Sequence, residues 1–153
     1  MRRIQCQKLE QEHLFSLLRE VRPDEDEATH RRMALTKCRL GPGFAFTCDH
    51  GRLIACGGVT VYWEGMGEVW LVISDHAKVE HKLELVMWTK WGLDQIQAEC
   101  KLRRLQADVL ASDAGAISFV KHFGFKLEGL MRSYDALGRD AFRYARIREV
   151  NHD

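Results

Sequence analysis

The sequence has no long apolar run, no apolar leader and no excess of charge of either sign. No stretch approaches the roughly eighteen apolar residues that a membrane helix requires, and the first residues, MRRIQCQK, form no apolar signal core. The chain has 23 basic and 22 acidic side chains, so no global field favours nucleic acid or an anionic membrane as a partner. We therefore expect a soluble, cytoplasmic protein that binds neither nucleic acid nor membrane.

Cysteines in a paired arrangement are also absent. The five cysteines lack any CxxC spacing, which is typical of unreactive thiols in a reducing compartment. Neither Cys48, His50 and Cys56 nor His76 and His81 have the spacing of a common zinc site, so we expect no metal.

Length and composition indicate one compact unit. A chain of 153 residues can bury roughly two-thirds of its unfolded surface, which is enough for one core without disulfides. The sequence contains no internal repeat, low-complexity segment or linker. We expect a single domain over residues 1–153.

Hydrophobic periodicity predicts a strand, two helices and three further strands in the first half of the chain. Acidic residues 24–27 favour the start of the second helix, where the helix dipole stabilises negative charge. Glycines in the short connections 49–51 and 64–67 indicate hairpins. The expected elements are a strand over 2–9, helices over 10–21 and 24–37, and strands over 44–48, 53–63 and 68–73.

The second half begins with a long apolar helix and continues with alternating elements. Residues 80–100 are apolar on more than one side, which is typical of a buried central helix. Leu105, Ala107 and Val109 alternate with polar residues and predict a strand over 104–110. A helix opens at Ser112 and Asp113 and ends at Gly124. Strands over 125–134 and 141–148 follow, with a hairpin loop over 135–139.

A set of positions in residues 104–144 then identifies a family resemblance. These positions are Gly124, Phe125, Glu128, Gly129, Arg132, Gly138, Arg139, Asp140 and Tyr144. In this order they resemble the GNAT superfamily of acyl-CoA-dependent N-acyltransferases, and within it the ribosomal-protein N-terminal acetyltransferase type. A weaker similarity links the chain to GNAT-like proteins of tailed phages. The resemblance implies an α+β fold with a mixed, mostly antiparallel sheet of six to seven strands, splayed fourth and fifth strands, and about four helices.

The resemblance also implies acetyl-CoA as the acyl donor. In the family the fourth strand contacts the pantetheine arm, and the segment after it binds the pyrophosphate through N–H groups and glycines. Here His76 stands at the place of the family's Arg or Gln, and Val79 and His81 replace its glycines. Asp113 stands where many members have an Asn that contacts the pantetheine, although it could equally be a helix N-cap. The implied cofactor-binding residues are Leu71, Val72, Ile73, His76, Lys78, Val79, His81, Lys82 and Asp113.

Catalysis in the family is direct attack of an amine on the thioester, which requires a base. We expect Glu68 to be that base, with Glu64 and Glu128 as other candidates. A backbone N–H near Val72 or Ile73 would polarise the thioester carbonyl. The family's acid, a Tyr on the next helix, is replaced by Val120. Glu68 could also be an ordinary solvated carboxylate.

Three functions remain open on the sequence alone. The first is an N-acetyltransferase acting on a protein N-terminus, a lysine or a small amine. The second is a structural or interaction component with an altered cofactor loop, associated with a phage virion and a protein assembly partner. The third is a sensor that binds CoA or another nucleotide without transfer. Fold alone does not decide among them.

Overall fold

The structure, a computed structural model, describes residues 4–148 and contains one mixed sheet with helices on both faces. The strand order is β1-β2-β3-β4-β5-β7-β6, and β4 with β5 is the parallel pair. The strands are β1 (Gln5–Lys8), β2 (Gly43–Thr47), β3 (Leu53–Trp63), β4 (Met66–Ile73), β5 (Arg104–Leu110), β6 (Lys126–Met131) and β7 (Ala141–Ile147). The helices are α1 (Gln11–Val21), α2 (Glu27–Arg39), α3 (Asp75–Glu80), α4 (Lys82–Glu99) and α5 (Ala114–His122). The predicted fold class is confirmed.

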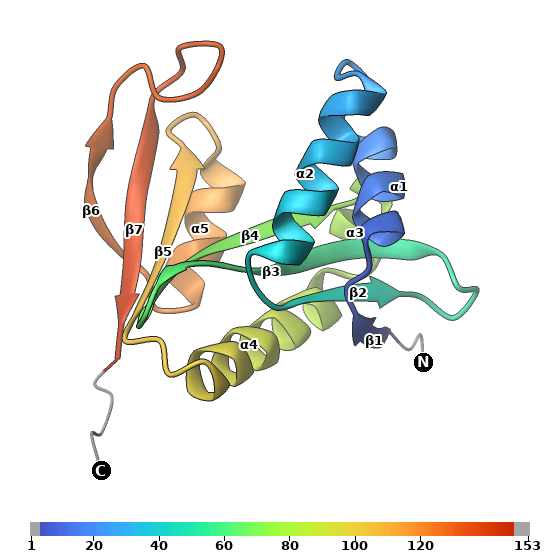
Figure 1. Cartoon of the computed structure of the whole chain (residues 1–153), viewed down its shortest axis with the longest axis horizontal. Helices are drawn as coiled ribbons and strands as arrows, with labels where there is room; N and C mark the ends of the chain where they lie inside the picture. Colours follow the sequence, from blue (N-terminus) through green and yellow to red (C-terminus); the bar gives the residue numbers. More distant parts are fainter. Residues whose placement is uncertain (1–3, 149–153) are drawn as a thin grey trace.

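Two helical layers cover opposite faces of the sheet, as Figure 1 shows for α1 and α2 on one side and α4 on the other. The strands carry one set of side chains to each layer because successive residues alternate between faces. On the first face, Leu14, Leu17 and Leu18 of α1 pack with Cys56 and Val72. On the second face, the core is formed by Val59, Leu93, Ile96, Leu102, Leu105, Ala107, Val109, Phe123, Phe125 and Tyr144.

The fourth and fifth strands diverge, as the family resemblance implied. Their pairing is confined to three residue pairs, from Met66 with Arg104 to Glu68 with Gln106. Beyond that point β5 turns away from β4, while β4 continues along β3 to Ile73 (Figure 1). The edge of β4 from Val69 to Ile73 therefore pairs with no described strand on the β5 side.

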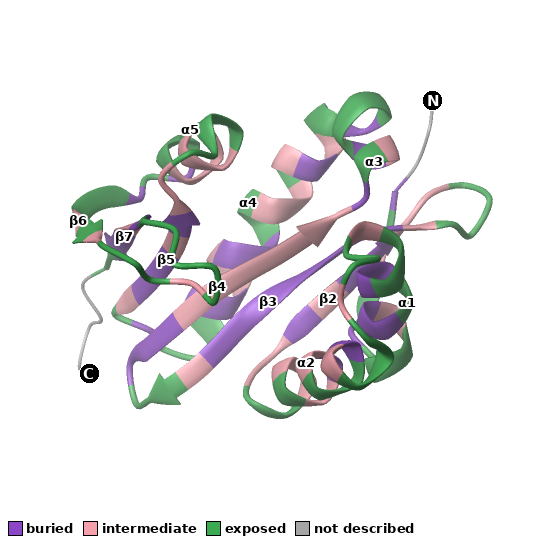
Figure 2. Ribbon diagram, turned by 90° about the horizontal axis from the view of Figure 1, so that it is seen from above, coloured by how far each residue is buried: buried purple, intermediate pink, exposed green. Residues whose placement is uncertain are grey.

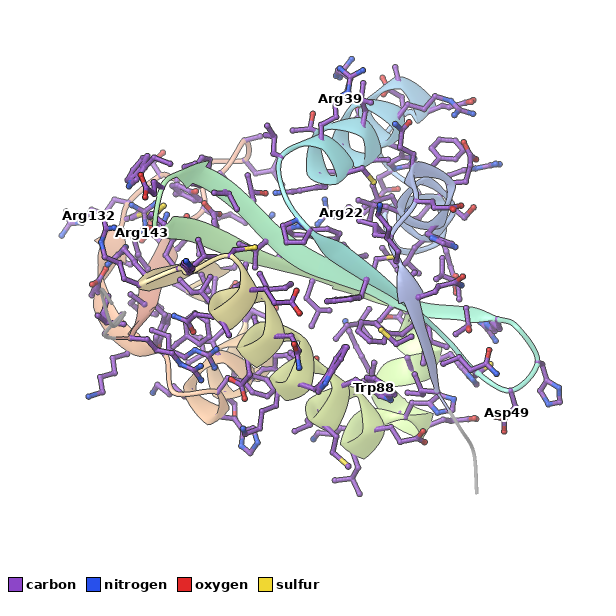
Figure 3. All side chains as sticks on the ribbon, turned by 60° about the horizontal axis from the view of Figure 1, so that its bottom comes forward. Arg22, Arg39, Asp49, Trp88, Arg132 and Arg143 are labelled. Atoms are coloured by element: carbon purple, nitrogen blue, oxygen red, sulfur yellow. The ribbon has the colours of Figure 1, made fainter. Side chains whose placement is uncertain are left out.

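Helix α4 is less buried than its composition predicted. Its inner face packs on the sheet; Trp88, for example, lies with its ring centroid 6.2 Å from that of Phe46 (Figure 3). On its outer face Leu83 is 80% exposed and Met87 71% exposed, and exposed residues follow the outer sides of the helices in Figure 2. The expectation of a buried central helix is wrong for this face. Within residues 4–148 no second layer covers it.

Two further expectations concern membranes and thiols. Within residues 4–148 no helix combines the length and the apolar character that crossing a bilayer requires. All five cysteines are free thiols. Burial raises the pKa of the Cys56 thiol to about 12, so it stays protonated and unreactive at neutral pH.

The conformation of Gly124, at the end of α5, gives a prediction about stability. The chain leaves this helix through Gly124 at φ +86°, and a Cβ added there would meet nothing nearer than Arg146 Cδ at 3.9 Å. Because the cost is conformational rather than steric, we expect Gly124→Ala to lower the free energy of unfolding by about 1 kcal/mol. Urea denaturation measures this change.

Gly115 provides the matched control within the same helix. An added Cβ would lie 3.6 Å from Asp113 Oδ1, an ordinary contact. Alanine favours the helix, so Gly115→Ala should leave stability unchanged or raise it by about 0.5 kcal/mol. Equal destabilisation by both substitutions would contradict the assignment of Gly124 as the residue that requires positive φ.

Candidate functional site

The candidate site lies where β4 and β5 separate. Glu68 and Gln106 form the last pair between these strands. Trp70 and Val72, which follow Glu68 at spacings of two, pack with α1, so Glu68 faces the same layer. The fold therefore places a carboxylate at the apex of the opening, on the face covered by α1 and α2.

Glu68 is held by donors from both neighbouring strands. The Tyr62 hydroxyl donates to Glu68 Oε2 at 2.8 Å, and Gln106 Nε2 donates to the same oxygen at 3.5 Å. Gln106 is only 6% exposed. Both hydrogen bonds end on Oε2. Among the residues that the structure describes, none donates a hydrogen bond to Oε1.

A second carboxylate, that of Asp108, lies two residues beyond Gln106 on β5. Asp108 accepts two hydrogen bonds from Arg143 of β7, at 2.9 and 3.0 Å. The hydroxyl of Tyr134, from the β6–β7 connection, donates to Asp108 Oδ2 at 2.8 Å. Figure 3 shows Arg143 on the β7 side of the molecule, far from the Asp49 hairpin. A bidentate arginine fixes this carboxylate firmly.

Burial and the hydrogen bonds to these carboxylates raise the pKa of both tyrosines. Burial and the hydrogen bond to Glu68 raise the pKa of Tyr62 to about 12. The hydrogen bond to Asp108 and burial raise the pKa of Tyr134 to about 12. Both side chains are thus phenols, and hydrogen-bond donors, throughout the neutral range.

The raised pKa values give a prediction at alkaline pH. In the unfolded chain a tyrosine has a pKa of about 10, so the stabilisation from these two hydrogen bonds is complete below that pH. It is lost as the pH rises from about 10 towards 12. We expect ultraviolet titration of the folded protein to show two tyrosines ionising late, and Tyr62→Phe to remove one of them. Ionisation of both near pH 10 in the folded state would contradict these hydrogen bonds.

A small pocket lies between β4 and the first two helices. Its volume is about 170 Å³. Lys37 of α2 lines it, and Lys37 Nζ lies 3.5 Å from Thr60 Oγ1 on β3, opposite Glu68. Burial lowers the pKa of Lys37, an effect that the charge of Glu68 opposes. The lining residues are Leu14, Leu18, Arg22, Met33, Lys37, Trp70, Leu71 and Val72.

The two other candidate bases are placed less favourably. Arg104 binds both oxygens of Glu128, with distances of 2.9 and 2.5 Å. This bidentate hydrogen bond holds the pKa of Glu128 below its usual range. Glu64 is exposed in the turn between β3 and β4. Of the three carboxylates, only Glu68 lies at the divergence of the strands.

Leu71, Val72 and Ile73 lie on the part of β4 that β5 leaves unpaired. This is the backbone edge that the sequence assigned to the pantetheine arm. Their opposite edge pairs with β3, through Gly57, Cys56 and Ala55. The geometry is that of an exposed strand edge able to donate and accept hydrogen bonds along an extended ligand.

The segment expected to be a cofactor loop is helical instead. Residues 75–80 form α3, which Ser74 caps by accepting a hydrogen bond from the Ala77 N–H at 3.2 Å. The loop expectation for residues 75–82 is wrong. Without glycines, the alanine, lysine and glutamate of this segment favour a helix once Ser74 caps it and Ala77 packs in the core.

The helix separates the predicted phosphate ligands. His81 is 3% exposed, whereas Val79 is 83% exposed. Lys78 Nζ lies 3.8 Å from Asp75 Oδ1, and Lys82 is exposed at the start of α4. His76 and His81 lie with ring centroids 5.7 Å apart. The two lysines and His76 remain accessible to an anion, but buried His81 does not.

Asp113 acts as the N-cap of α5. Its Oδ1 accepts a hydrogen bond from the Ala116 N–H at 3.0 Å, so the structural alternative that the sequence allowed is present. Val120, at the place of the family's acid, packs against the core. The nearest phenols to Glu68 are Tyr62 and Tyr134, which come from other elements.

Sequence reasoning missed Tyr62, Gln106, Asp108, Tyr134 and Arg143. One signal was available in the alternation of side chains. Gln106 and Asp108 are the polar residues on one face of β5, and Thr60 and Tyr62 share one face of β3. The folded chain decides which of these residues meet. Strand register places the two faces next to each other, and the β6–β7 connection brings in Tyr134.

No family model and no curated protein matches the chain. Among solved structures, one described as a candidate phosphinothricin N-acetyltransferase is 11% identical, with a TM-score of 0.78 over 95% of this chain and 98% of that chain. A variant of the spermidine N-acetyltransferase SpeG from Vibrio cholerae is 14% identical, with a TM-score of 0.75 and 94% of each chain covered. An acetyltransferase candidate from Acinetobacter baylyi is 12% identical, with a TM-score of 0.73 over 100% of this chain and 97% of that chain. The chain is thus similar in fold to GNAT N-acetyltransferases.

Proposed function

We propose that this GNAT-fold chain is an acyl-CoA-dependent N-acetyltransferase that transfers an acetyl group directly to an amine. One observation carries the proposal: Glu68 is held by Tyr62 and Gln106 at the point where β4 and β5 separate. The site offers a carboxylate, phenol donors and an unpaired strand edge within one opening. The similarity in fold to N-acetyltransferases supports the same reaction class.

The donor would be acetyl-CoA, extended along the free edge of β4. Backbone N–H groups near Val72 and Ile73 would hydrogen-bond the pantetheine and polarise the thioester carbonyl. The phosphates would lie near the exposed Lys78 and Lys82, since these cations attract them. The helical conformation of residues 75–80 gives fewer free N–H groups than a glycine loop, so charge carries more of the affinity.

Glu68 would accept the proton that the amine must lose before attack. The Tyr62 hydroxyl fixes one carboxylate oxygen, which leaves the other oxygen to receive the proton. The nitrogen then attacks the thioester carbonyl and the C–S bond breaks. The second proton of the attacking nitrogen passes to the leaving thiolate, so CoA departs as the free thiol. Tyr134 remains a phenol at neutral pH, and its hydroxyl donates to Asp108 in the same opening.

The acceptor would be a protein N-terminus, a lysine or a small amine. The pocket of about 170 Å³ between α1, α2 and β4 has mostly apolar walls and would admit a narrow aliphatic chain. Spermidine, the acceptor in the names of the Vibrio cholerae neighbours, has such a chain. We place this activity in the cytoplasm, without nucleic acid or membrane as a partner.

Calorimetry with acetyl-CoA, followed by detection of free thiol in the presence of a panel of amines, tests the proposal. We expect saturable binding that weakens with added salt, because the lysines interact with phosphates at the surface. Release of CoA should depend on the amine. No binding at millimolar acetyl-CoA would overturn the proposal.

A second candidate function is a structural or interaction component, the role that the sequence linked to phage virions. The observation that favours it is the apolar stripe on α3 and α4, formed by Val79, Leu83, Met87 and Trp91. These residues recur every fourth position and are 43% to 83% exposed. Absence of acetyl-CoA binding by a folded chain would favour this candidate over the enzyme.

A further inference from the structure

Three side chains at the junction of α3 and α4 bring two imidazoles and a carboxylate together. One ligand atom from each of His76, Glu80 and His81 lies within 4.8 Å of the other two. His76 Nε2 lies 3.5 Å from Glu80 Oε2, four residues further along the same helix. His81 is the residue at which α3 passes into α4.

We propose that His76, Glu80 and His81 bind a divalent transition metal ion, with Zn²⁺ as the fitting class. With bonds of about 2.0–2.1 Å in a tetrahedral site, two ligand atoms are about 3.4 Å apart. The His76–Glu80 distance of 3.5 Å already has this value. Rotation of the partly exposed side chains of His76 and Glu80 would close the remaining separations.

The ligand set indicates the type of metal. Two imidazoles and one carboxylate form a three-ligand zinc site that leaves a fourth position for water or another ligand. Magnesium and calcium prefer sites made of oxygen ligands, so a site dominated by imidazole disfavours them. A site of this kind would be specific for borderline metals.

The burial of His81 is the independent observation that points to a ligand. The residue is 3% exposed, and its Nδ1 is buried without a hydrogen bond to any residue that the structure describes. Glu84 Oε1 lies 3.5 Å from this nitrogen. A metal would give the imidazole the partner it lacks, either at Nδ1 or by fixing the tautomer whose Nδ1–H donates to Glu84.

A simple ion pair explains less of this arrangement. A protonated His76 with Glu80 would form an ordinary surface pair between residues four apart on a helix. Such a pair gives no reason for a buried imidazole beside it. The expectation of no metal at His76 and His81 rested on spacing in a supposed loop, and the helix changes which of these atoms are neighbours.

Zinc titration of the purified full chain tests the proposal without any acyl donor. Competition with a chromogenic chelator gives affinity and stoichiometry, and Co²⁺ absorption reports tetrahedral coordination and any thiolate ligand. We expect one Zn²⁺ per chain, no thiolate band, and a rise in the thermal unfolding midpoint. His76→Ala and Glu80→Gln should each lower affinity at least about tenfold.

His50→Ala is the matched control, because His50 is an exposed histidine in the β2–β3 hairpin. It should bind zinc like the natural chain. His76→Ala and Glu80→Gln remove partly exposed side chains, so folding should survive and circular dichroism can verify it. Equal affinity in the natural chain and these two variants, or a thiolate band, would overturn the site. Zinc binding stands whether or not acetyl-CoA binds.

Discussion

Replacement of Glu68 by Gln should lower kcat about 10² to 10⁴-fold while leaving the affinity for acetyl-CoA unchanged. The amide keeps the shape of the carboxylate, and its oxygen can still accept the hydrogen bond from Tyr62. It cannot take a proton from the amine, and a positioned base contributes rate factors of about this size. Steady-state kinetics of CoA release, combined with calorimetry, separates the two effects.

Glu64→Gln is the control for this prediction. Glu64 lies four residues earlier, exposed in the β3–β4 turn, and loses the same charge on substitution. We expect its kcat to stay within about twofold of the natural value, since a general loss of surface charge has little effect on a local proton transfer. Equal kcat for the natural chain and Glu68→Gln would exclude Glu68 as the base.

Leu105→Ala should lower the free energy of unfolding by about 3 kcal/mol. Leu105 is fully buried in β5, within the core that joins this strand to α4 and β7. Truncation loses the transfer free energy of the side chain and leaves a cavity that packed neighbours cannot fill. Urea denaturation measures the change, provided that the slope with denaturant is preserved.

Leu127→Ala removes the same atoms from the edge strand β6, which β7 separates from β5. Leu127 lies in β6 and is 55% exposed, so the substitution should change stability by no more than about 0.5 kcal/mol. Comparable losses at both positions would show that β5 is not the buried centre of the domain. A smaller loss at Leu105 than at Leu127 would contradict the burial of Leu105.

The elements of the second half followed from local sequence. The alternation of Leu105, Ala107 and Val109 predicted β5 with the bounds that the structure has. Asp113 caps α5 and Gly124 ends it at positive φ, as their positions in the sequence indicated. Caps and periodicity act over a few residues, so the chain alone carries this information.

Other boundaries depended on contacts that the sequence does not show. The strand expected over 125–134 is shorter, since β6 ends at Met131. The cofactor loop became α3 because Ala77 packs in a core made by distant strands. The outer face of α4 is exposed because no other element that the structure describes lies against it. The expectation for residues 2 and 3 lies outside the described residues.

In the candidate site, too, one residue could be identified from the sequence and the others only from the structure. Glu68 was identified from a strand end and a family resemblance, and the structure places it where β4 and β5 separate. Tyr62, Asp108 and Tyr134 reach the same opening from three other segments.

The sequence by itself determined the order and type of most elements and the GNAT fold that they build, because periodicity, caps and turns are local properties. Only the tertiary structure decided which side chains surround Glu68 and which histidines meet at residue 81. Those neighbours come together through strand register and helix packing, and both depend on contacts between residues that are far apart in the chain.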